Sequence, residues 1–99
     1  MRAAGMAVAA ACFFALAETA MAAAPAPPSG AASCSGCHPM SAKVETRVPR
    51  LVGRKPADIV AAMQAFRSGQ KAATVMDRIA KGFSDAEIRA IADWLGGQH

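Results

Sequence analysis

Two cysteines and a histidine stand together in the segment Cys34-Ser35-Gly36-Cys37-His38. The pattern Cys-x-x-Cys-His is the attachment motif of c-type haem. Two thiols on one helical turn can add to the two vinyl groups of a porphyrin, and the histidine that follows is then placed beneath the iron as an axial ligand. Gly36 has no side chain to obstruct the ring. The motif therefore predicts one covalently bound haem c, attached through Cys34 and Cys37, with His38 on the iron.

Three kinds of haem-free site compete with this interpretation. A structural zinc site needs four ligands, and beyond the motif the only other histidine or cysteine outside the amino-terminal segment is His99. A thioredoxin-like redox pair requires a strand leading into the motif, whereas Pro, Ala, Ser and Gly precede Cys34. A disulfide between Cys34 and Cys37 would leave His38 without a role. Haem attachment accounts for all three residues.

A second axial ligand must reach the opposite face of the ring, and methionine and histidine are the usual choices. The candidates are Met40, Met63, Met76 and His99. Met40 lies two residues after His38, a span of about 7 Å at most, which is too short. Met63 occupies a core-facing position in a helical pattern, and His99 is the last residue, where chains fray. Met76 is therefore the favoured ligand, with Met63 and His99 as alternatives.

The first 22 residues have the composition of an export signal. Arg2 gives a positive start, residues 3–17 carry no charge, and Ala20-Met21-Ala22 has the small-x-small pattern that precedes peptidase cleavage. An uncharged run of this length is shorter than the roughly 20 residues that a membrane span needs. The alternatives are an uncleaved anchor and a lipoprotein modified at Cys12. We expect a signal peptide over residues 1–22, with cleavage between Ala22 and Ala24 and release of the mature chain into the periplasm, without stable membrane insertion.

The mature part divides into a leader and one small domain. Residues 23–32 (AAPAPPSGAA) predict a flexible leader, and residues 33–99 form the expected haem domain. A domain of this size makes only a marginal core, and two cysteines so close in sequence cannot close a long loop. A large apolar cofactor would supply the buried surface that the side chains lack.

Helical patterns account for the rest of the chain. A Pro in the first turn and a Gly at the end predict a helix over residues 56–69. A capping box and a regular apolar face predict a second over residues 84–95. Residues 72–80 favour a short helical turn around Met76, and residues 39–54 are polar and irregular. With no strand alternation, we expect an all-α fold in which the helix carrying the motif crosses the terminal helix.

Three stretches carry a resemblance to a known family: the Cys-x-x-Cys-His motif, residues 48–53 (VPRLVG) and residues 65–94, within which MDRIAKGFSD at 76–85 is the most telling. They resemble bacterial class I cytochromes c, and within that class the small monohaem cytochrome subunit of flavocytochrome c sulfide dehydrogenase. The likeness covers nearly the whole chain from Ser33. It implies the class I cytochrome c fold, three to five helices around one covalently bound haem.

The resemblance also implies roles for individual residues. Cys34 and Cys37 would hold the haem thioethers, and His38 and Met76 would be the axial ligands. Pro49 would offer its carbonyl to the ring N–H of His38, the outer bond that fixes the orientation of the ring. Trp94, in the terminal helix, would serve packing.

Such a site transfers electrons and catalyses nothing on its own, because an iron with six ligands has no open position for a substrate. The resemblance implies the electron-accepting subunit of a sulfide-oxidising complex, partnered by its flavoprotein dehydrogenase subunit or another redox protein. The alternative is a free cytochrome that shuttles electrons to a terminal oxidase or reaction centre. The net charge is +4, and the basic residues form either a solvated face or a docking surface for an acidic partner. Nucleic acid is not an expected partner, because the positive residues are not interleaved with aromatic ones.

Overall fold

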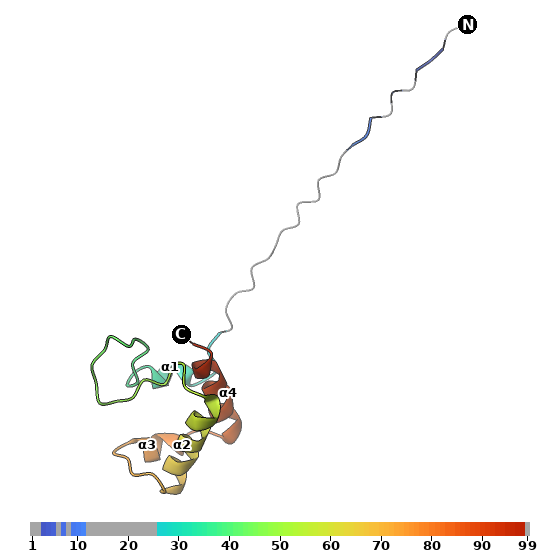
Figure 1. Ribbon diagram of the computed structural model, residues 1–99. Helices are drawn as coiled ribbons and strands as arrows, with labels where there is room; N and C mark the ends of the chain where they lie inside the picture. Colours follow the sequence, from blue (N-terminus) through green and yellow to red (C-terminus); the bar gives the residue numbers. More distant parts are fainter. Residues whose placement is uncertain (1–2, 6, 8, 12–25, 99) are drawn as a thin grey trace.

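A computed structural model describes residues 3–5, 7, 9–11 and 26–98 (Figure 1). Over these residues the chain forms four helices and no strand: α1 (Ala31–Cys34), α2 (Pro56–Ser68), α3 (Met76–Ala80) and α4 (Asp85–Gly96). The prediction of an all-α chain is confirmed for this part. None of these helices is long and apolar enough to cross a membrane.

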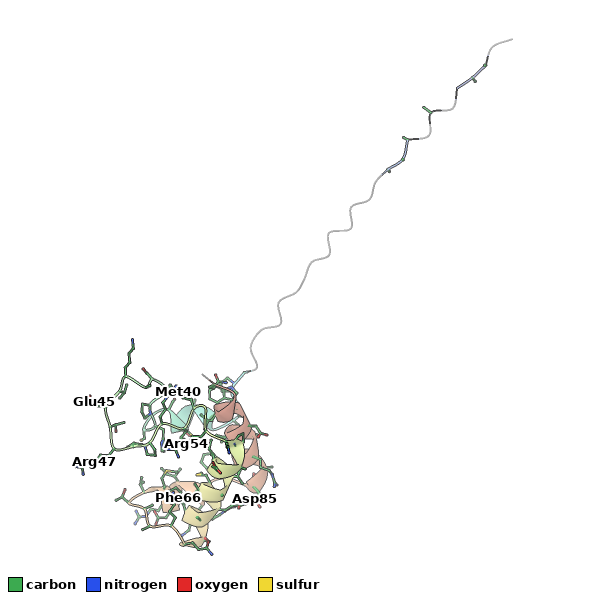
Figure 2. The ribbon with its side chains drawn as sticks, viewed as in Figure 1. Met40, Glu45, Arg47, Arg54, Phe66 and Asp85 are labelled. Carbon is green, nitrogen blue, oxygen red and sulfur yellow. The ribbon has the colours of Figure 1, made fainter. Side chains whose placement is uncertain are left out.

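The predicted signal peptide falls mainly on residues outside those that the structure describes. Its described members, residues 3–5, 7 and 9–11, are exposed and belong to no helix. Residues 39–55, between the motif and α2, also contain no helix, as predicted, and Figure 2 shows Glu45 and Arg47 at the outer bend of this loop.

The ends of α2 are set by the residues that the sequence pattern indicated. Pro56 occupies the first helical position, where its missing N–H costs no hydrogen bond. Asp58 lies in the first turn, near the positive end of the helix dipole. Gly69 ends the helix in a left-handed conformation with φ of 81°, which glycine adopts without steric cost.

A complete capping box begins α4. The Glu87 N–H donates to the Ser84 hydroxyl oxygen over 3.2 Å, and the Ser84 N–H donates to Glu87 Oε1 over 3.0 Å. The backbone bond from Ser84 lowers the pKa of the Glu87 carboxyl, with a further contribution from the Ser84 hydroxyl. The Glu87 carboxylate therefore makes its full contribution above the ordinary pKa of glutamate and loses it as the pH falls through the lowered, folded-state pKa.

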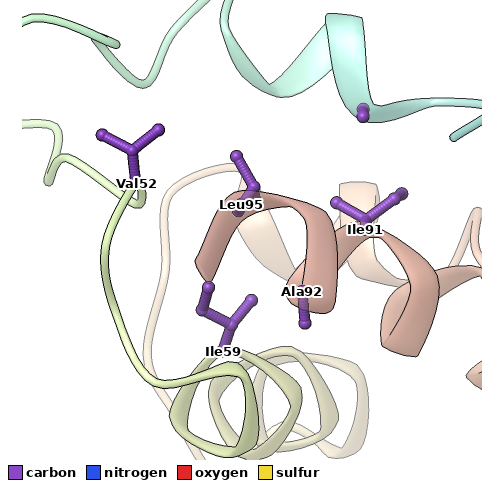
Figure 3. Close-up of a cluster of buried hydrophobic side chains, with 6 residues drawn as sticks. Val52, Ile59, Ile91, Ala92 and Leu95 are labelled. Carbon is purple, nitrogen blue, oxygen red and sulfur yellow. The ribbon is translucent and has the colours of Figure 1, made fainter. Parts of the chain in front are cut away.

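The core is a small cluster where α4 meets α1, α2 and the loop before α2 (Figure 3). Its buried members are Ala31, Val52, Ile59, Ile91, Ala92 and Leu95. Trp94 is partly buried against this cluster, in the packing role expected for it. An ion pair between Arg67 of α2 and Asp85 of α4 links the two long helices at the surface.

The packed domain begins earlier than the leader prediction placed it. Ala31 is only 1% exposed. Gly30 has φ of 86°, and a Cβ there would lie 2.6 Å from a ring carbon of Phe83. The predicted leader, residues 23–32, is therefore wrong at its carboxyl end, since its last residues pack against the core. An Ala/Gly run resembles a linker, and only the fold shows that small residues are needed where α1 meets Phe83.

Gly96 allows two helices to approach closely. It is the last residue of α4, and a Cβ at this position would lie 2.8 Å from Cγ of Pro56 and 2.9 Å from the carbonyl oxygen of Arg54. The end of α4 thus rests directly on the start of α2. Its neighbour Gly97 has φ of −84° and only ordinary contacts at 3.6 Å, so glycine is not required there.

We expect Gly96→Ala to lower the free energy of unfolding by about 1–3 kcal/mol, the usual cost of overpacking. Helix propensity alone would predict the opposite change, because replacing glycine with alanine stabilises an exposed helix by about 1 kcal/mol. Thermal or denaturant unfolding measures the change, with Gly97→Ala as the matched control that should cost little. Equal stability of the two variants would contradict the close contact at Gly96.

Candidate cofactor-binding site

A cavity of about 860 Å³ lies beside the core and takes its walls from every part of the domain. The first wall is the motif with Cys34, Cys37 and His38; the others come from residues 47–54 of the loop, from Ile59, Met63 and Phe66 of α2, from residues 71–76, and from Ile88, Ile91 and Leu95 of α4. Most of these side chains are apolar. A volume of this size is within the roughly 300–1,000 Å³ typical of ligand and cofactor sites.

The orientation of His38 is fixed by the loop. Its Nδ1 lies 2.5 Å from the carbonyl oxygen of Pro49. A carbonyl oxygen only accepts hydrogen bonds, so Nδ1 is the donor to Pro49 and Nε2 is the ring nitrogen left for another partner. Both residues border the cavity. His38 is therefore held in the tautomer that leaves Nε2 to bind a metal ion.

The two thiols border the same cavity, Cys34 from the end of α1 and Cys37 from the turn that follows it. Cys34 is the last residue of α1, and the His38 N–H donates to its carbonyl oxygen over 2.8 Å, which closes one helical turn around the motif. Both cysteines are free thiols, Cys34 partly buried and Cys37 exposed. Burial raises the pKa of the Cys34 thiol. The motif thus presents two sulfur atoms and one imidazole to a single apolar space.

A structural zinc ion at the motif would need four ligands. Among the described residues, no three His, Cys, Asp or Glu side chains are grouped so that they could hold a metal ion. His99, the remaining candidate ligand for zinc and for the sixth position of a haem, lies outside the described residues.

Two of the candidate methionines line the cavity. Met76, the first residue of α3, and Met63, on α2, both border it and are both partly buried. Met40 does not line the cavity and is 39% exposed. The sequence pattern gave Met63 a core-facing position, and the structure places it facing the cavity instead. Periodicity alone cannot separate these two outcomes, because both put the side chain on the inner face of α2.

Charged residues at the cavity were not part of the predicted site. Arg47, Arg54, Lys71 and Asp58 border the cavity. Arg54 Nε donates to the carbonyl oxygen of Arg50 over 2.9 Å, and Arg50 Nε donates to that of Met40 over 3.0 Å. The two arginines therefore brace the loop that carries Pro49, the partner of His38. The Lys71 ammonium lies 5.1 Å from the centre of the Phe66 ring, within reach of a cation–π interaction.

The chain is similar in sequence to two known proteins. No family model matches the chain. It is 38% identical over 64 residues, 65% of its length, to the cytochrome subunit of sulfide dehydrogenase from Chlorobaculum tepidum. The chain is similar to electron-transfer cytochromes. It is also 33% identical over 73 residues, 70% of its length, to the thiosulfate dehydrogenase electron acceptor from Thiomonas intermedia.

These matches confirm the resemblance to a cytochrome subunit that the motif and the flanking stretches predicted. The chain spans 58% of the length of the first relative and 34% of the second. One relative is named as a cytochrome subunit and the other as an electron acceptor.

Proposed function

We propose that this chain is a monohaem c-type cytochrome with the class I cytochrome c fold, serving as the electron-accepting subunit of a periplasmic flavocytochrome c sulfide dehydrogenase. The observation that carries the proposal is the meeting of Cys34, Cys37, His38 and Met76 at one apolar cavity. The similarity to the cytochrome subunit of sulfide dehydrogenase supports the choice of complex.

The residues at the cavity fit one covalently held haem. Each thiol, of Cys34 and of Cys37, would add across one vinyl group, forming an S–C bond while its hydrogen passes to the neighbouring carbon, so the attachment needs no oxidant. The Nε2 atom of His38 is free to bind iron because Nδ1 is bonded to Pro49. Met76 would supply a thioether sulfur from another wall of the cavity. When bound, the haem supplies a one-electron Fe(III)/Fe(II) couple.

The protein side chains determine how that couple is used. Pro49 orients His38, which strengthens the imidazole as a ligand. Met76 would occupy the last position on the iron and leave none for a substrate, and methionine ligation raises the reduction potential. The apolar walls from α2 and α4 would cover part of the haem and limit its contact with water. The arrangement suits outer-sphere transfer of single electrons and no bond-making chemistry.

The proposed location follows from the chemistry and from the amino terminus. Residues 1–22 would act as a cleaved export signal, which brings the motif to the periplasm, where c-type haem is attached. The flavoprotein subunit of the dehydrogenase is the proposed electron donor.

Replacing Met76 by Leu should remove the methionine–iron charge-transfer absorption of the oxidised protein while the haem stays covalently bound. Leucine keeps the volume of the side chain and lacks only the sulfur ligand. Met63→Leu is the matched control, because it lines the same cavity and should retain the absorption. Loss of the band only in Met63→Leu would transfer the ligand role to Met63, and its persistence in both variants would exclude both residues.

Co-purification from the native host distinguishes a subunit from a free shuttle. We expect the haem-loaded chain to elute in a stable 1:1 complex with a flavin-containing chain and to be reduced when sulfide is added to that complex. A haem-loaded monomer that never associates with a flavoprotein would support the free cytochrome and contradict the subunit role.

A further inference from the structure

We propose that Arg50 is a positioning residue for His38: its guanidinium keeps the loop closed, so that the Pro49 carbonyl stays on the imidazole and tunes the reduction potential of the haem iron. The inference rests on the proposed function, since it concerns the strength of His38 as an iron ligand. Arg50 does not line the cavity, whereas Pro49 and Leu51 on either side of it do. Arg50 therefore acts on the site through the backbone and not by contact with the cofactor.

Two hydrogen bonds join the ends of the loop between the motif and α2. His38 Nδ1 donates to the carbonyl oxygen of Pro49 over 2.5 Å. Arg50 Nε donates to the carbonyl oxygen of Met40 over 3.0 Å. Among the described residues, no other hydrogen bond joins residues 38–40 to residues 48–50. The two bonds are neighbours, so the second restrains the movement that would break the first.

The Arg50 end of the loop is attached to the core. The Gly53 N–H donates to the carbonyl oxygen of Leu95 in α4 over 3.1 Å. Arg54 Nε donates to the carbonyl oxygen of Arg50 over 2.9 Å. Residues 40–46, in contrast, are exposed and do not line the cavity, so neither the core nor a cofactor holds them. The Arg50 side chain therefore ties an exposed segment to the fixed part of the domain.

Without the bond to Met40, the loop would be closed by the bond between His38 and Pro49 alone. That bond would then carry the whole entropic cost of bringing the loop ends together, and it would be formed less of the time. A hydrogen bond from the outer ring nitrogen makes an imidazole a stronger ligand, and a stronger electron donor favours Fe(III) over Fe(II). Weakening the bond should therefore raise the reduction potential of the one-electron couple.

The test compares two substitutions of Arg50 that remove the same charge. Glutamine places an N–H donor where arginine has Nε along the side chain, and methionine places a methyl group there. Only Arg50→Gln can therefore keep the bond to the Met40 carbonyl. The buried core contains no residue between positions 39 and 50, so both variants should fold, and Arg50→Leu provides a second donor-free variant.

Two quantities are measured on each purified, haem-loaded variant. A redox titration followed by visible absorption gives the reduction potential. Nuclear magnetic resonance gives the rate at which the Nδ1 proton of His38 exchanges with solvent, which reports the bond to Pro49 directly. A role in folding alone would change neither quantity between two folded variants of equal charge.

We expect the potential of Arg50→Met to lie about 30 mV above that of Arg50→Gln, an approximately threefold change in the Fe(II)/Fe(III) ratio, since a tenfold change is about 59 mV for one electron. The Nδ1 proton should exchange on the order of tenfold faster in Arg50→Met, because the loop opens more often. Equal potentials or equal exchange rates in the two variants would overturn the role of Arg50. A wild-type protein without haem absorption would instead refute the proposed function before any variant is compared.

Discussion

The space between the motif and the inner faces of α2 and α4 governs the structure of this chain. The cavity there has a volume of about 860 Å³, while Leu95 is the only large side chain among the described residues that is fully buried. Apolar walls of this extent in a domain this small are stable when an apolar group fills them, because burial of apolar surface is the main favourable contribution to folding. The same side chains that would form a core thus become the lining of a cofactor site.

The polar contacts around the cavity hold its lining residues in place. The bond between His38 and Pro49 sets the tautomer of the imidazole, and it depends on a loop that contains no helix. Arg50 and Arg54 hold that loop through bonds to backbone carbonyls. At the end of the same loop, the close approach of Gly96 to Pro56 fixes α4 against α2, and these two helices form much of the cavity wall.

The helix ends and the cofactor motif were predictable from the sequence, because each depends on residues close together in the chain. Both ends of α2 follow from Pro56 and Gly69, and the start of α4 follows from Ser84 and Glu87, because the effects of these residues extend over only a few positions. The motif predicts its own cofactor because thiol spacing and the following histidine are local constraints. Met63, in contrast, could not be assigned, because the face of a helix that meets a cavity has the same apolar pattern as one that meets a core. Ala31 was assigned to the leader for a related reason, since an alanine buried in a core and an alanine in a linker cannot be told apart by composition. The basic residues around the cavity come together only in three dimensions.

The central claim is that a haem bound covalently at Cys34 and Cys37 forms the interior of the domain. The most direct measurement is the absorption spectrum and mass of the chain purified after export, before and after denaturation. We expect a reduced c-type spectrum and one haem mass that stays with the polypeptide after it is unfolded. A colourless chain that folds cooperatively, or one that releases its chromophore on denaturation, would contradict it.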